Sequence, residues 1–439
     1  MREEPIVILG GGIAGLAASM ACGAPVFEAG SQPGGVAASD AADGFVFDRG
    51  IHILQSRHKR ALELFDHLGV QFSAHKRRAF IHSHGKYTPY PFQVNTAGLP
   101  LALRARCVWG FVRRHHEPEP RNYEEWMYRS LGRGFAQTFL IPYSEKFWTV
   151  HPREMSFEWT GGRVPQPRLS QVLRGALWSR QTRIGTNAEF RYPEPGAGYG
   201  AVARRLAEHA GPVHLGCRAT RIDVRRRIVE FDGAPPLRYQ DLISSIALPE
   251  LVALCPDAPE EVVAAARRLR SNSILVVNLG INAPAIRDMH WVHFPEPDVA
   301  FFRISYPHNF AHDVAPPGLS SISAEVAYSE QRPLDRATIV DRVIADLVRV
   351  GALDRADQVI SRQVHDVRRA YCIYDMQRHD SVRTVHHWLR EVGILPTGRY
   401  GLWTYFWSDQ AMLSGRGAGL RVLRERAERD GAALGQQAA

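Results

Sequence analysis

Three glycines near the N-terminus, Gly10, Gly12 and Gly15, have the spacing Gly-x-Gly-x-x-Gly. Gly10 permits a tight turn, Gly12 lets the backbone approach a pyrophosphate, and Gly15 lets a helix pack closely on a strand. Ile13 and Ala14 stand where that helix would begin, and the free N–H groups and dipole of a helix N-terminus favour negative charge. The spacing therefore indicates binding of a dinucleotide.

The elements around this turn must position the glycines. Residues 6–9 are all apolar and predict a buried parallel strand. Residues 25–27 predict the next strand, which ends at Glu28, close to the spacing expected for an acid that binds ribose hydroxyls. An ordinary glycine-rich turn is the alternative, but the strand, the helix and the acid together favour the dinucleotide.

A second glycine turn, Gly34-Gly35 followed by Val36, comes shortly after Glu28. An acid followed by a Gly-Gly turn resembles the N-terminal signature of FAD-binding flavoenzymes of the amine-oxidase type. Nicotinamide dehydrogenases usually lack it. The resemblance implies that FAD, rather than NAD, is the tightly held cofactor.

The composition narrows the class of protein. The 439 residues are 45% apolar and 23% charged, which is typical of a soluble globular chain with more than one domain. The sequence predicts neither a membrane span nor a signal peptide, and its five scattered cysteines favour a cytoplasmic location over a disulfide framework. The net charge of +9 comes without a nucleic-acid module, and indicates either a solvated basic surface or a site for a small polyanion.

The remaining pattern predicts alternating helices and strands. We expect a helix near 60–68, a β-hairpin over 80–87 that turns at 84–85, and an ordered loop at 89–93. Residues 98–160 are expected to be mainly helical, and 201–209 and 335–350 to be helices. Strands are expected at 213–215, 219–224, 241–245, 273–280 and 300–306. The Arg-rich helix at 416–430 is expected to be solvated.

Blocks of residues from about 5 to 420 resemble the UDP-galactopyranose mutase group of FAD proteins, within the amine-oxidase and protoporphyrinogen-oxidase superfamily. The glycine loop, Tyr192-Pro193 and the segment Asp409-Gln410-Ala411-Met412 mark the superfamily and imply contacts to FAD. The implied fold is α/β, with a Rossmann-like FAD domain of the GR2 type, an inserted helical domain and a mixed or antiparallel β-sheet domain for the substrate. The implied boundaries are 1–68, 190–245 and 385–439 for FAD, 98–165 for the helices, and 69–97, 166–189 and 246–384 for the substrate side.

Other blocks resemble the mutases themselves. The resemblance implies that His52 lies beside the flavin ring and that Arg399 lies on the flavin side. It implies that Arg163 and Arg303 bracket a sugar diphosphate, to which Tyr371 and Tyr405 donate hydrogen bonds. The planar fork of arginine suits such an anion better than a lysine.

The substrate's base and sugar are less well defined by the sequence. The resemblance implies substrate contacts from one loop and four further positions: Tyr90, Phe92, Gln93, Tyr143, Trp148, Asn187 and Trp291. Two positions depart from the family pattern, because Ile51 replaces a glycine and Ser144 replaces an asparagine that contacts the base. The sugar and the base therefore stay open.

The implied activity is the interconversion of pyranose and furanose forms of a nucleotide sugar through an adduct of reduced flavin N5 with the sugar. NAD(P)H would reduce the flavin. Two alternatives remain: an FAD oxidase or desaturase of a small or apolar substrate, and a non-catalytic flavoprotein that partners a glycosyltransferase. The sequence predicts no metal site, and leaves a homo-oligomer open.

Overall fold

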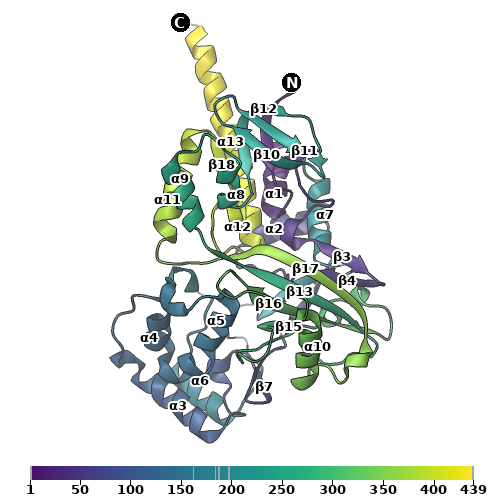
Figure 1. Ribbon diagram of the computed structural model, residues 1–439, viewed down its shortest axis with the longest axis vertical. Coiled ribbons are helices and arrows are strands. Elements are labelled where there is room, and N and C mark those ends of the chain that lie inside the picture. The colour runs from purple at the N-terminus through teal and green to yellow at the C-terminus, as the bar shows by residue number, and fades with distance from the viewer. Residues whose placement is uncertain (1, 162, 183, 186–187, 196–197, 438–439) are drawn as a thin grey trace.

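The computed structural model describes residues 2–161, 163–182, 184–185, 188–195 and 198–437. Two seven-stranded sheets and a group of helices make up most of the chain. In Figure 1 the first sheet lies in the upper part, the helical lobe at the lower left and the second sheet at the lower right. The predicted α/β class is confirmed.

The first sheet contains the N-terminal strand. Its order is β10–β11–β12–β1–β2–β9, and β18 also pairs with β12. The strands at its centre are parallel, whereas β10, β11 and β12 are antiparallel neighbours. The bounds are β1 Arg2–Leu9, β2 Val26–Phe27, β9 Val213–His214, β10 Arg218–Asp223, β11 Ile228–Asp232, β12 Leu237–Ser244 and β18 Ile394–Pro396.

Helices cover both faces of this sheet, which explains why residues 6–9 are all apolar. Ile6 and Ile8 pack in one hydrophobic core with α1, α7 and α13, while Val7 and Leu9 pack in another with α8, α9 and α11. A parallel strand buried on both faces reads as a continuous apolar run. The helices are α1 Ile13–Cys22, α7 Gly200–Glu208, α8 Leu248–Ala253, α9 Glu260–Arg268, α11 Arg378–Glu391 and α13 Ser408–Gln437.

The expectation that the Arg-rich C-terminal helix is solvated is wrong for one of its faces. Met412, Ala418 and Val422 of α13 are buried in the core with α1. Arg426 and Arg429 form ion pairs with Asp241 at 2.8 and 2.7 Å. The numerous arginines in this segment obscure the apolar stripe in the sequence. Only the face of α13 that points away from α1 is solvated.

The second sheet has the order β17–β13–β16–β15–β14–β6–β7. Its pairs are antiparallel except β14–β6, and the hairpin β6–β7 turns at 84–85 as predicted. Helix α10, Ile339–Arg349, packs in a core with β13, β15 and β16. The strands are β6 Ala79–Ser83, β7 Lys86–Pro89, β13 Ser271–Ile281, β14 Trp291–His293, β15 Arg303–Ser305, β16 Ser320–Tyr328 and β17 Val359–Cys372.

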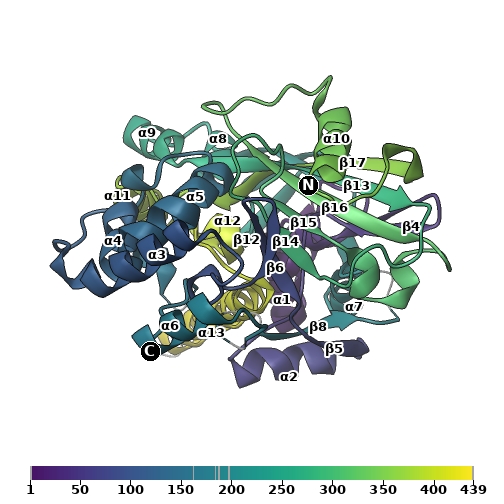
Figure 2. The same cartoon turned by 90° about the horizontal axis from the view of Figure 1, so that it is seen from below.

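The helical lobe lies beside the second sheet (Figure 2). It consists of α3 Leu101–Arg113, α4 Tyr123–Phe135, α5 Ile141–Trp148 and α6 Leu169–Leu177, with a π-helical turn at Ala136–Leu140. The smaller elements are α2 Lys59–His67, α12 Gly398–Gly401, the β3–β4 pair of Ser39–Ala42 and Phe45–Asp48, and the β5–β8 pair of Phe72–Lys76 and Glu189–Pro193. The domain boundaries remain predictions, and α8 and α9 pack with the first sheet although 246–384 was assigned to the substrate side.

Candidate functional site

The glycine turn between β1 and α1 has the geometry of a nucleotide cradle. Gly10 has a φ of +94°, and a Cβ on Gly15 would lie 1.9 Å from the Gly10 carbonyl oxygen. Gly12 is the N-cap of α1, and no side chain caps it. The Glu28 carboxylate accepts hydrogen bonds from the N–H groups of Gly11 and Gly30, each at 2.6 Å. The turn is thus ordered by the acid that the sequence singles out.

The space around this turn fits FAD. A Cβ on Gly12 would have the Gly34 oxygen, 3.9 Å away, as its nearest neighbour, so the backbone there is open to a ligand. Gly35 faces the same opening, and Val36 lines the adjoining cavity. Asp409 is buried with Oδ2 bonded to Ser56 at 2.6 Å, while its Oδ1 has no partner among the described residues. An open helix N-terminus and a buried acceptor are what a dinucleotide needs.

Four predicted cofactor residues contribute in other ways. Ile13 of α1 and Met412 of α13 are buried in one hydrophobic core, and Ala14 of α1 is buried where that helix meets Gly415 of α13. These side chains therefore shape the cradle from behind. Gln410 accepts hydrogen bonds from the Trp407 N–H at 3.2 Å and from Arg163 at 3.4 Å. Gln410 therefore joins the cofactor side to the cavity described next.

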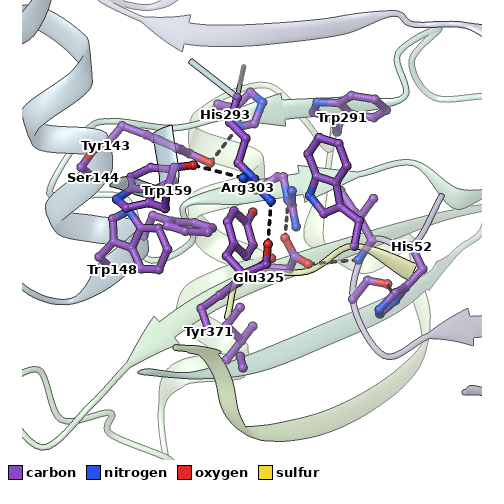
Figure 3. Close-up of a pocket in the computed structure, with 18 of the residues that line it drawn as sticks. His52, Tyr143, Ser144, Trp148, Trp159, Trp291, His293, Arg303, Glu325 and Tyr371 are labelled. Atoms are coloured by element: carbon purple, nitrogen blue, oxygen red, sulfur yellow. Dashed lines mark hydrogen bonds and ion pairs between the residues drawn. The ribbon is translucent and has the colours of Figure 1, made fainter. Parts of the chain in front are cut away.

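A cavity of about 290 Å³ lies between the cradle, the second sheet and the helical lobe. Most of the predicted cofactor-ring and substrate residues line it (Figure 3). They are Val36, His52, Tyr90, Gln93, Tyr143, Trp148, Arg163, Trp291, Arg303, Tyr371, Arg399 and Tyr405. They come from positions up to hundreds of residues apart, and the fold brings them together.

Two predicted substrate residues are not part of this wall. Phe92 is fully buried, stacks on Phe139 with ring centroids 5.0 Å apart, and meets the edge of Phe135. It belongs to the core of the helical lobe, so the expectation that it contacts a base is not supported, and Tyr90 is the aromatic residue of its loop that lines the cavity. Asn187 lies outside the described residues.

Arg303 enters the cavity already paired. Its Nε donates to Oε2 of Glu325, and the other oxygen of that carboxylate accepts from the Ile51 N–H at 3.1 Å. Only 16% of the Arg303 side chain and 3% of the Glu325 side chain are exposed. Burial lowers the pKa of Arg303, but the adjacent carboxylate outweighs it and holds the pKa above its ordinary value.

Arg163 and Arg399 have a different environment. Arg163 donates to the carbonyls of Trp159 and Tyr405 at 3.1 and 2.6 Å, and its buried Nε has no partner among the described residues. Arg399 donates to the carbonyls of Phe406 and Ala370 at 2.9 and 3.2 Å. Neither guanidinium has a carboxylate partner in the part of the chain that the structure describes.

The lining therefore carries excess positive charge. Glu325 neutralises Arg303, and Asp40 neutralises Arg49, which also lines the cavity, at 2.8 Å. Arg163 and Arg399 are left as two positive charges without a carboxylate. Because the side chains around them are largely apolar and give a low local dielectric, these two arginines favour binding of a polyanion.

Four aromatic side chains form one wall beside these arginines. Tyr371 and Tyr405 meet edge to face with centroids 5.4 Å apart, and Trp148 lies 5.9 Å from the Tyr405 ring. The guanidinium of Arg163 lies over the Tyr405 ring at 4.9 Å. Phe147 packs on Tyr371 at 4.6 Å. The wall keeps two phenols beside the cations.

His52 is neutral in this site. Burial and the charge of Arg399 lower its pKa to about 4. Its Nδ1 lies 3.1 Å from the Gly50 carbonyl oxygen, in the loop that also bonds Glu325. A buried neutral imidazole suits a supporting contact better than transfer of a proton at neutral pH.

The sequence did not single out Glu325 or His293. Tyr143 and His293 share a hydrogen bond of 2.9 Å, and burial together with the charges of Arg303 and Arg77 holds the pKa of His293 well below its ordinary value. A lone Glu within the small and apolar residues of β16 was the available signal for Glu325. His293, two residues after Trp291, could have been found because alternate strand residues share a face.

Residues 25–412 match the family of flavin containing amine oxidoreductases, and the chain belongs to this family of FAD-binding enzymes. Within it the fold is that of a UDP-galactopyranose mutase-like flavoprotein. A crystal structure of reduced UDP-galactopyranose mutase is 26% identical, with 96% of this chain and 95% of that chain covered and a TM-score of 0.90.

Two further solved structures share the fold at lower identity. A putative protoporphyrinogen oxidase from Exiguobacterium sp. 255-15 is 18% identical, covers 97% of this chain and 100% of its own, and has a TM-score of 0.74. A double mutant of putrescine oxidase is 15% identical, covers 96% and 99%, and has a TM-score of 0.64.

Proposed function

We propose that this enzyme is a flavin-dependent sugar-nucleotide mutase, which interconverts the pyranose and furanose forms of a nucleoside diphosphate sugar. The observation that carries the proposal is the pair of uncompensated guanidinium groups, Arg163 and Arg399, in the cavity beside the FAD cradle. The likeness to a mutase over nearly the whole chain supports it. An amine substrate would be repelled by these charges.

Arg163 and Arg303 would bind the two phosphates of the substrate. Arg163 has a buried Nε ready to donate, and Arg303 is held in the cavity by Glu325. Tyr371 and Tyr405 supply phenol O–H donors next to them. Because a departing diphosphate gains negative charge, donors fixed in a dry site stabilise its departure more than they stabilise the bound substrate.

The chemistry at the sugar would come from the cofactor. Bound in its reduced form, FAD would supply the nucleophile for covalent catalysis at the anomeric carbon, with NAD(P)H as the external reductant. The protein residues would orient the sugar, exclude water and hold the diphosphate. Tyr90, Gln93 and Tyr143 line the part of the cavity formed with the helical lobe, and we assign them to the base.

Binding and turnover test the proposal in sequence. A thermal-shift panel of UDP, dTDP, GDP and their sugars on the FAD-loaded enzyme identifies the nucleotide sugar that stabilises most, because a ligand of the native state raises its melting temperature. That sugar is then offered to dithionite-reduced and to oxidised enzyme, and furanose is measured by chromatography. Conversion by reduced enzyme only is expected. Equal behaviour of the two forms, or a flat panel, contradicts the mutase.

A single substitution tests the role of Arg163. Loss of a charge-assisted hydrogen bond costs about 1.5–3 kcal/mol, so Arg163→Ala should lower kcat/KM about 10- to 150-fold while FAD stays bound. Arg383→Ala is the matched control, since that side chain is 70% exposed on α11. Unchanged turnover in the Arg163 variant would remove Arg163 from the site.

Oxidation of a small substrate is the second candidate, because the chain belongs to a family of flavin oxidoreductases and because aromatic rings line much of the cavity. It predicts oxygen consumption with a candidate amine or apolar substrate that added nucleoside diphosphates do not inhibit. Inhibition by UDP or its analogues would favour the mutase.

A further inference from the structure

Helices α3 and α6 form the outer face of the helical lobe, away from the cavity. They pack on each other, and the Arg104 guanidinium of α3 donates to the Ala176 carbonyl of α6 at 3.0 Å. Figure 1 places both at the end of the lobe remote from the first sheet. Their inner faces are buried, whereas their outer faces carry large apolar side chains.

On α3 the exposed apolar residues are Leu101, Trp109 and Val112, which are 74%, 62% and 45% exposed. Positions separated by three, eight and eleven residues share one face of a helix. Cys107 and Phe111 point to the opposite side and are buried. Apolar residues therefore occupy both the inner and the outer face of this helix, and those on the outer face are not covered by the described chain.

On α6 the apolar residues recur every fourth position. Leu169, Leu173 and Leu177 are 40%, 45% and 63% exposed, and Trp178, which follows the helix, is 68% exposed. The inner face packs so closely that a Cβ on Gly175 would lie 2.1 Å from the Val94 carbonyl oxygen. Seven of the thirteen exposed large apolar side chains in the described part of the chain thus lie on these two helices or, for Trp178, directly after α6.

The charge of this face has one sign. Residues 67–116 and 159–188 contain no Asp or Glu. Exposed arginines stand among the apolar residues: Arg106, Arg113, Arg168, Arg174 and Arg180. The next acids along the chain, Glu117 and Glu119, are paired with Arg133 and Arg129 of α4 at 2.8 and 3.1 Å. What covers this face must therefore be both apolar and anionic.

A second copy of the chain fits poorly, because a two-fold contact would bring the arginines of one face onto those of the other. We propose that the α3–α6 face binds the surface of an anionic lipid bilayer, with Trp109, Trp178 and the leucines in the interfacial layer and the arginines at the headgroups. Tryptophan and arginine are the side chains that settle at this depth. The proposed attachment is peripheral, because it uses one face of the folded chain. Among the described residues no helix is long and apolar enough to cross a bilayer.

Vesicle flotation of the FAD-loaded full chain tests this. We expect it to float with vesicles of phosphatidylcholine and phosphatidylglycerol and to stay behind with phosphatidylcholine alone. Raising the salt from about 0.1 M to 1 M shortens the Debye length from about 10 to 3 Å and should release most of the protein. Arg113→Gln and Arg174→Gln should each weaken binding about fivefold.

The triple variant Trp109→Ser, Leu173→Ser, Trp178→Ser should lose binding and keep its flavin absorbance and melting temperature. Ile360→Ser and Met376→Ser are matched controls, since both side chains are exposed elsewhere, at 51% and 60%. If the triple variant fails to fold, the salt series and the arginine variants still decide the question.

Absence of flotation with anionic vesicles overturns the proposal and leaves an acidic protein as the occupant of this face. Equal flotation with both kinds of vesicle overturns the role of the arginines. A wild-type dimer that the triple variant converts to monomer, with no flotation of either, would show that two copies cover the face after all. Because no residue of α3 or α6 lines the cavity, each result is independent of the proposed mutase activity.

Discussion

Arg303 and Glu325 stand directly opposite each other on neighbouring antiparallel strands, β15 and β16, and form a buried ion pair across them. The second oxygen of Glu325 accepts from the Ile51 N–H, in the loop that carries His52. A Cβ on Gly50 would lie 3.0 Å from the same oxygen. One carboxylate thus fixes both a cavity arginine and the loop that carries His52.

Glu325→Gln should destabilise the enzyme strongly. Removing one partner of a buried ion pair leaves an uncompensated charge and costs about 3–5 kcal/mol. We expect that loss in the free energy of unfolding in urea. Because Arg303 would then be a third unneutralised cation in the cavity, UDP should raise the melting temperature of the variant more than that of the wild type.

The control for this substitution is Glu250→Gln, whose carboxylate pairs with Arg369 at 2.8 Å with 55% of its side chain exposed. An exposed pair contributes less than about 1 kcal/mol. If both variants lose the same stability, the buried pair has no special role. If UDP raises the melting temperature of the Glu325 variant less than that of the wild type, Arg303 does not act as a third unneutralised cation in the cavity.

Acid should destabilise the wild type partly through His52. The pKa of His52 is about 4 in the folded chain and about 6.5 in the unfolded chain, so the unfolded state binds more protons between these values. The stability that the neutral ring confers is fully present above pH 6.5 and is lost as the pH falls towards 4, by about 3 kcal/mol. His52→Gln should lose this part of the pH dependence.

Buried Asp48 acts in the opposite direction, which makes the comparison with wild type necessary. Burial raises the pKa of Asp48 to about 6, although Ser39, Tyr192 and Tyr199 donate to its carboxylate. The contribution of the protonated Asp48 carboxyl to the stability of the fold is fully present below the unfolded pKa of about 3.9. It is lost as the pH rises through 6. The free energy of unfolding of the wild type and of the His52→Gln variant should therefore be measured from pH 4.5 to 7.5. The difference between the two curves is the contribution of His52, because Asp48 is present in both. Parallel curves would show that His52 is not buried in neutral form.

The features that the sequence predicted well are local. The glycine turn depends on Gly10, Gly12 and Gly15, and the hairpin turn on His84-Gly85, so neighbouring residues suffice to determine each backbone. The expected α/β fold was confirmed for a similar reason, because the apolar patterns that indicate strands and helices are also local features of the sequence. The functional roles of the cavity residues stay predictions.

What the sequence did not predict depends on contacts between distant segments. Glu325 meets Arg303 from 22 residues away and Ile51 from 274 residues away, and no local pattern encodes either contact. The outer helix α13 hides an apolar stripe among arginines, which becomes visible only when α1 lies beside it. Sequence blocks place a residue near a site, whereas packing decides which way its side chain points.

The crossing of α1 and α13 predicts opposite effects for two neighbouring glycines. A Cβ on Gly415 would lie 1.9 Å from the Ala14 carbonyl oxygen, and a Cβ on Gly417 meets nothing within 4 Å. Gly415→Ala should push α13 off the cradle helix, lowering both the melting temperature and FAD retention. Gly417→Ala should stabilise by about 0.5–1 kcal/mol, because alanine favours helix. Equal melting temperatures would contradict the close crossing.

The loop 89–93 contains a residue that lines the cavity, Tyr90, and a residue that packs in the core, Phe92. Phe92 is fully buried, so Phe92→Ala should cost about 3–5 kcal/mol of stability, while UDP affinity per folded molecule stays unchanged. Tyr90 lines the cavity beneath the Arg77 guanidinium, which lies 4.7 Å above its ring, so Tyr90→Ala should weaken UDP binding with a smaller loss of stability. Urea unfolding and UDP titration of each variant give the two quantities separately. The reverse pattern would place the base against Phe92 and would require the helical lobe to open on binding.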